Sequence, residues 1–148
     1  MANGNVAGYA VDVTPKEAWE ILKNEKSAVL VYVRSAAEWK FISIPDLASI
    51  DKEVATIEWK NYPGAGGSMV ENTDFIDQIK SICPNPDTKI LSLCRSGQRS
   101  ISTSIVLTNE GFNQCYNVNE GFEGDMNDDK HRGQTGGWKV RGLAWKQT

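Results

Sequence analysis

One cysteine stands where the sequence predicts an activated thiolate. An apolar run over residues 89–93 ends at Cys94, and a polar stretch with a central glycine follows it. A strand that leads through such a loop into a helix directs several backbone N–H groups at one point, and these groups stabilise an anion. Neighbouring arginines add to that stabilisation. We therefore expect Cys94 to be a nucleophile held in an anion-binding loop, whose residues are Arg95, Ser96, Gly97, Gln98, Arg99 and Ser100.

The other chemically active side chains lack such surroundings. Cys83 follows an apolar helix pattern and Cys115 opens an apolar run, so both are expected to be small buried hydrophobic residues. The single histidine, His131, lies in a polar tail and is expected to be a solvated loop residue. No two cysteines have the C-x-x-C spacing, which argues against a structural zinc site and a disulfide framework. We expect reduced thiols and no metal or cofactor.

Local patterns predict the elements that position this loop. Thr14 and Glu17 form a capping box around Pro15, which predicts a helix over residues 15–24. The continuous apolar run at 28–33 is typical of a strand buried on both faces of a parallel sheet. Further strands are expected within 54–59, at 89–93 and at 115–118. Further helices are expected at 35–39, from 72 or 73 to 84, and at 100–110 with Gly111 as its left-handed cap. The second of these helices is amphipathic, and its apolar face consists of Phe75, Ile76, Ile79 and Ile82.

Length and composition indicate one α/β domain. The 148 residues are 40% hydrophobic and 24% charged, and helices alternate with short strands. Residues 1–9 are expected to form a tail, and residues 120–148 a glycine-rich, loop-dominated segment attached by Trp138, Leu143 and Trp145. The net charge of −3 and the absence of a basic stripe argue against nucleic-acid binding. Neither a signal sequence nor an apolar stretch of about 18 residues is present, so we expect no membrane association and a cytoplasmic location.

The segment from Leu93 to Ser100 resembles the active-site loop of rhodanese-type sulfurtransferases. Further similarities lie, in the family's order, at residues 30–34, 38–39, 44–45, 116–122, 137–138 and 142–143. The resemblance implies a three-layer domain in which helices cover both faces of a mostly parallel sheet of about five strands. It also implies that Cys94 accepts a sulfane sulfur from a donor such as thiosulfate, carries it as a persulfide and passes it to a thiophilic acceptor. Donor and acceptor would be small molecules or a protein persulfide.

Three departures from the family pattern are visible. Tyr32 stands where the signature has aspartate, residues 42–46 replace a Gly-His-Ile-Pro-Gly segment, and residues 124–136 resemble an insertion.

Two other functions are compatible with the same loop. Cysteine phosphatases and related arsenate reductases also place a thiolate between a strand and a helix, but they follow a Cys-x5-Arg pattern. Only four residues separate Cys94 from Arg99. The shorter loop suits a sulfur atom better than a phosphoryl group with three non-bridging oxygens. The second alternative is a rhodanese-like binding module without catalytic activity. If the chain is a sulfurtransferase, Arg99 and Arg95 are the residues expected to attract an anionic donor.

Overall fold

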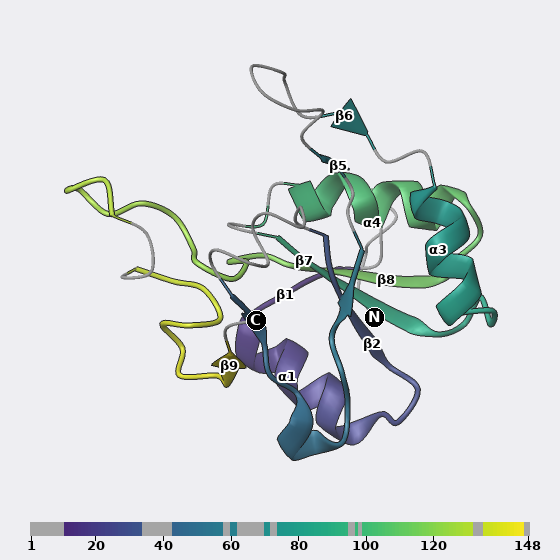
Figure 1. The fold of residues 1–148 in the computed structure, drawn as a ribbon, viewed down its shortest axis with the longest axis horizontal. Coiled ribbons are helices and arrows are strands. Elements are labelled where there is room, and N and C mark those ends of the chain that lie inside the picture. Colours follow the sequence, from purple (N-terminus) through teal and green to yellow (C-terminus); the bar gives the residue numbers. More distant parts are fainter. Residues whose placement is uncertain are drawn as a thin grey trace.

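A five-stranded parallel sheet forms the centre of the protein (Figure 1). The computed structural model describes residues 11–33, 43–57, 60–61, 70–71, 74–94, 97, 99–131 and 135–146. The strand order is β1-β8-β7-β2-β4, and every neighbouring pair is parallel. The strands are β1 (Val11–Val13), β2 (Val29–Tyr32), β4 (Ala55–Thr56), β7 (Lys89–Leu93) and β8 (Gln114–Val118). The predicted α/β fold with a mostly parallel sheet is confirmed.

Helices cover both faces of the sheet, as predicted (Figure 1). Helix α1 (Pro15–Asn24) packs on one face, and α3 (Phe75–Ile82) and α4 (Arg99–Asn109) pack on the other. Alternate residues of β2 point to opposite faces. Leu30 therefore lies in the cluster with α1, and Val31 in the cluster with α3 and α4. This two-sided burial explains why the strand is apolar without interruption.

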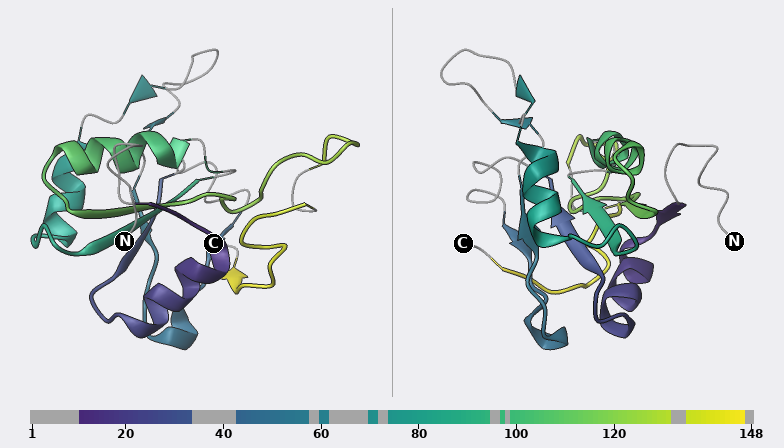
Figure 2. Two further views of the ribbon diagram at one scale, coloured as in Figure 1. Left: turned by 180° about the vertical axis from the view of Figure 1, so that it is seen from behind. Right: turned by 90° about the vertical axis from the view of Figure 1, so that its right-hand side faces the viewer.

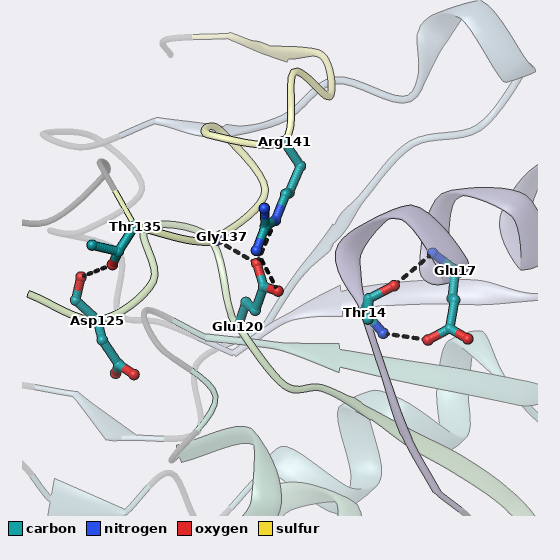
Figure 3. A network of polar contacts seen from close by, with 7 residues as sticks. All are labelled: Thr14, Glu17, Glu120, Asp125, Thr135, Gly137 and Arg141. Carbon is teal, nitrogen blue, oxygen red and sulfur yellow. Dashed lines mark hydrogen bonds and ion pairs between the residues drawn. The ribbon is translucent and has the colours of Figure 1, made fainter.

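The capping box predicted for α1 is present (Figure 3). The Thr14 hydroxyl accepts a hydrogen bond from the Glu17 backbone N–H at 3.1 Å, and the Thr14 backbone N–H donates to the Glu17 carboxylate at 2.8 Å. The bounds of α1 match the prediction because these contacts satisfy the first N–H groups of the helix.

The apolar face of α3 differs from the prediction at its end. The helix begins at Phe75 rather than at residue 72 or 73, and Ile82 is 46% exposed, so its predicted place on the buried face is wrong. The buried positions are Phe75, Ile79 and Cys83, four residues apart. Because the buried stripe follows this spacing, Cys83 takes the place in the core that the sequence pattern gave to Ile82.

The segment after β8 is built mainly from turns and returns to the body of the protein. Trp138 is fully buried and packs edge-on against Trp19, with 5.9 Å between ring centroids. Trp145 does not attach the segment by burial, because it is 44% exposed. It lies in β9 (Trp145–Lys146), which pairs antiparallel with β3 (Ile44–Pro45), and the Lys139 ammonium lies 4.1 Å from the centroid of its ring.

The remaining short elements lie outside the main sheet. They are the antiparallel pair β5 (Lys60–Asn61) and β6 (Val70–Glu71) and a 3₁₀ turn at Ala48–Ile50. Residues 124–131 extend away from the sheet (Figure 2). The predicted tail at 1–9, the predicted helix at 35–39 and the last two residues of the strand predicted within 54–59 fall outside the described residues. None of the described helices combines the length and the hydrophobicity of a membrane-spanning segment.

Candidate functional site

Cys94 lies at the carboxyl edge of the central sheet. It directly follows β7, the middle strand, and its side chain is 1% exposed. The Cys94 carbonyl accepts a hydrogen bond from the Phe122 N–H at 2.8 Å, and the Leu93 carbonyl accepts one from the Val33 N–H at 2.9 Å. The backbone on both sides of the cysteine is therefore fixed to neighbouring segments. The carboxyl edge of a parallel sheet is where α/β proteins place ligand sites.

Two backbone donors and one hydroxyl surround the Cys94 sulfur. The backbone N–H groups of Gly97 and Ser100 each donate to Sγ at 3.3 Å, and the Ser100 hydroxyl lies 3.2 Å from it. Ser100 is the second residue of α4, so the positive end of the helix dipole faces the sulfur. Such an arrangement is suited to stabilising a sulfur anion.

The structure describes part of the predicted loop. It brings Gly97 and Ser100 to the sulfur and makes Arg99 the first residue of α4. Arg95, Ser96 and Gln98 lie outside the described residues, as does the side chain of Arg99. The roles of these four residues therefore remain predictions.

Gly97 is required by the path of the loop. Its φ is +96°, a conformation that side-chain-bearing residues rarely adopt. A Cβ atom at this position would lie 2.1 Å from the carbonyl oxygen of Asn119. The loop thus passes against the end of β8 at a distance that only glycine permits, and this contact directs the Gly97 N–H at the sulfur.

A buried amide beside the loop was not singled out by the sequence reasoning. Asn117 of β8 is 1% exposed, and its Oδ1 accepts a hydrogen bond from the Ser100 hydroxyl. Its Nδ2 donates to Asp12 Oδ1 at 2.9 Å and to the Gly97 carbonyl at 3.3 Å. The available signal was an asparagine two residues after Cys115, hence on the same inward face of a short apolar strand.

The other titratable candidates occupy the environments that the sequence predicts. Cys83 and Cys115 are buried, and burial raises the pKa of both thiols, that of Cys115 to about 11. His131 is exposed, and its backbone N–H donates to the Asn127 side chain at 2.9 Å. Among the described residues, no group of three or more His, Cys, Asp or Glu side chains is arranged to hold a metal ion.

A charged contact holds the C-terminal segment next to the site (Figure 3). The Glu120 carboxylate accepts hydrogen bonds from Nε and Nη2 of Arg141, each at 2.9 Å, and from the Gly137 N–H at 2.8 Å. The Arg141 guanidinium is the main reason that the pKa of Glu120 is lowered, and the Gly137 N–H lowers it further. Glu120 lies only two residues before Phe122, which binds the Cys94 carbonyl.

A known family model matches the part of the chain that contains this site. The model of the rhodanese-like domain matches residues 14–128, which include Cys94 and its loop. The chain belongs to the rhodanese-like family. This rhodanese-like domain is 35% identical to the uncharacterized protein RP600 of Rickettsia prowazekii over 136 residues, which cover 91% of this chain and 96% of that protein. It is 26% identical to the thiosulfate sulfurtransferase GlpE of Glaesserella parasuis over 113 residues, covering 76% and 83% of the two chains.

Solved structures show the same fold. The rhodanese-like domain superimposes on the crystal structure of Rv0390 from M. tuberculosis with a TM-score of 0.83 and 41% identity, covering 95% of this chain and 99% of that one. It also matches the solution structure of the polysulfide-sulfur transferase homodimer from Wolinella succinogenes with a TM-score of 0.61 and 19% identity, covering 97% and 84%. At that identity, the second match supports the fold alone.

Proposed function

We propose that this rhodanese-like domain is a sulfurtransferase that carries a sulfane sulfur as a persulfide on Cys94. The observation that carries the proposal is the convergence of two N–H groups and one hydroxyl on the Cys94 sulfur at the start of α4. A thiolate and a persulfide are both anions, so the same donors stabilise the nucleophile and the intermediate. The similarity to proteins named thiosulfate sulfurtransferase supports thiosulfate as the donor to test first.

The reaction needs no proton transfer at the reacting sulfur. The Cys94 thiolate attacks the outer sulfur of thiosulfate, the sulfur–sulfur bond of the donor breaks, and its electron pair leaves with sulfite. Cys94 then carries a terminal sulfur with one negative charge. A thiophilic acceptor such as cyanide attacks that terminal sulfur and leaves as thiocyanate, and the electron pair returns to Cys94 as a thiolate. Charge balances in both steps, so no general base or acid is required.

The arginines of the loop have a recruiting role in this proposal. Thiosulfate carries two negative charges, and cationic side chains beside the loop attract it and orient it by charge-assisted hydrogen bonds. Arg99 is the stronger candidate because it lies at the first position of α4, directly before Ser100. Arg95 is the second candidate. The small separation between Cys94 and Arg99 supports sulfur as the cargo rather than phosphate.

Intact mass spectrometry after incubation with thiosulfate tests the proposal. The wild-type protein is expected to gain one sulfur atom and to lose it on addition of cyanide, with thiocyanate released. The variant Cys94→Ser should gain none, whereas the matched variant Cys83→Ser should behave as the wild type. An adduct that survives in Cys94→Ser would refute the assignment. The phosphatase-like alternative would be favoured if the protein hydrolysed a chromogenic phosphate ester or reduced arsenate and formed no persulfide. The binding-module alternative would be favoured if Cys94→Ser left partner binding unchanged.

A further inference from the structure

Asn117 connects the two ends of the loop that surrounds the Cys94 sulfur. Its side chain bonds to the Gly97 carbonyl and to the Ser100 hydroxyl, and these two residues supply the N–H groups that contact Sγ. Asp12, the register partner of Asn117 on the neighbouring strand β1, anchors the amide from the other side. The amide is thus fixed to the sheet by Asp12 and holds the loop through its other contacts.

The hydrogen-bond directions in this network follow from the chemistry of each group. The Asn117 nitrogen faces two acceptors, the Asp12 carboxylate and the Gly97 carbonyl, so the amide oxygen must face Ser100. A hydroxyl has a single hydrogen, and the Ser100 hydroxyl gives it to that amide oxygen. The Ser100 oxygen therefore offers a lone pair to a protonated Cys94, whose S–H is the donor in their contact.

Ionisation of Cys94 changes the partner of the Ser100 hydroxyl. Once the sulfur is an anion, it is a stronger acceptor than a neutral amide oxygen, because hydrogen bonds to charged groups are about twice as strong as neutral ones. The hydroxyl already lies 3.2 Å from Sγ and needs only to rotate its hydrogen. A carboxylate in place of the amide would compete with the sulfur for that hydrogen, and its negative charge would oppose ionisation of Cys94.

We propose that Asn117 is a positioning residue for the Cys94 sulfur: its neutral amide holds Gly97 and Ser100 around the sulfur and releases the Ser100 hydroxyl hydrogen to the ionised form. This inference deepens the proposed function and rests on it for its biological meaning. Asn117 acts on the sulfur through the two loop residues to which it is hydrogen-bonded. If the side chain had only a structural role in β8, it would not have to be uncharged, and its oxygen would not have to face Ser100.

The test measures alkylation of Cys94 by iodoacetamide at fixed pH, with peptide mass mapping to separate it from Cys83 and Cys115. Asn117→Asp is expected to slow this alkylation at least about tenfold, because a new negative charge beside the loop disfavours the sulfur anion that reacts with iodoacetamide. The matched control is Asn113→Asp. Asn113 also donates from Nδ2 to an aspartate, Asp87 Oδ1 at 2.5 Å, but on the surface. This control should leave the rate of Cys94 alkylation unchanged.

A charge-swapped double variant separates positioning from stability. Asp12→Asn with Asn117→Asp restores a donor and an acceptor between these two side chains, so part of the lost free energy of unfolding should return. Alkylation should stay slow, because a carboxylate still faces Ser100 and the Gly97 carbonyl. In the milder variant Asn117→Ser, the side chain is too short to bridge both loop residues, so alkylation of Cys94 should also slow. This variant replaces Asn117→Asp in the test if Asn117→Asp does not fold.

The outcomes distinguish this inference from the proposed function. Alkylation of a folded Asn117→Asp protein within twofold of the wild-type rate would overturn the role of Asn117, as would a double variant whose alkylation recovers together with its stability. If Asn117→Asp does not fold, an unslowed Asn117→Ser would overturn it equally. A wild-type protein that forms no persulfide with thiosulfate, while its Asn117 variants are alkylated slowly, would remove the sulfurtransferase proposal and leave the positioning of the sulfur standing.

Discussion

Replacing Gly97 with alanine is expected to destabilise the protein more than the same replacement at Gly111 and to abolish persulfide formation. The two glycines have nearly the same backbone conformation, with φ of +96° and +104°. They differ in their surroundings. A Cβ at Gly97 would lie 2.1 Å from the Asn119 carbonyl oxygen, whereas a Cβ at Gly111 would meet nothing within 4 Å. Gly111 is therefore a matched control for the close contact.

The expected magnitudes follow from these two contributions. A residue with a side chain in such a backbone conformation costs about 1–3 kcal/mol, and this cost applies at both positions. The loss of unfolded-state entropy on replacing glycine with alanine is also common to both. At Gly97, overpacking adds about 1–3 kcal/mol. The Asn119 carbonyl cannot move away freely, because the Asn119 N–H donates to the Val13 carbonyl at 3.0 Å. The total for Gly97→Ala is about 2–6 kcal/mol, within the usual stability of about 5–15 kcal/mol for a domain.

Urea unfolding of both variants and of the wild type measures the stability difference, and intact mass after thiosulfate treatment measures persulfide formation. We expect Gly97→Ala to lose the persulfide because relief of the contact with Asn119 moves the Gly97 N–H away from the sulfur. Gly111→Ala should form the persulfide as the wild type does. If Gly97→Ala costs no more stability than Gly111→Ala, the close approach of the loop to β8 is refuted. If it is destabilised but loads sulfur at the wild-type rate, the Gly97 N–H does not stabilise the sulfur anion.

Other perturbations test the surroundings of the site. Glu120 has a lowered pKa in the folded protein, so its contribution to stability is complete above its unfolded pKa and is lost as pH falls through the folded pKa. Between about pH 5 and about pH 3 the wild type should therefore lose more free energy of unfolding than Glu120→Gln, and parallel curves would contradict this. Burial raises the pKa of Cys115 to about 11, so iodoacetamide at neutral pH should modify Cys94 well before Cys115, and equal rates would exclude the activation of Cys94. Trp138→Ala should cost about 3–5 kcal/mol, because this side chain is fully buried. Trp145→Ala should cost about 1 kcal/mol, because the ring is 44% exposed and contributes mainly a cation–π contact; equal costs would contradict the different burial of the two rings.

Local interactions allowed much of the fold to be predicted. The capping contacts that define the start of α1 lie within four residues of the chain. The residues of β7 form a mainly apolar run in the sequence, which indicates a buried strand. The predicted bounds of both elements therefore agree with the structure. The positive φ of Gly111 after α4 was predicted for the same reason, since a helix end selects its own cap. The two-residue strands β3 and β9 could not be predicted in this way. Neither β3 nor β9 has a pattern of its own, and each exists because the other lies beside it.

The sequence by itself determined the candidate nucleophile and the family resemblance, and the tertiary structure decided what surrounds the sulfur. Cys94, Gly97 and Ser100 lie within seven consecutive positions, so a strand–loop–helix pattern was enough to place them together. Asp12 and Asn117 are 105 positions apart in the chain and have no chemical motif of their own. Only the pairing of β1 with β8 joins them, and only the packing of α4 on β8 brings Asn117 to Ser100. Hydrogen-bond partners of this kind depend on strand register, which is set by the whole sheet rather than by neighbours in sequence.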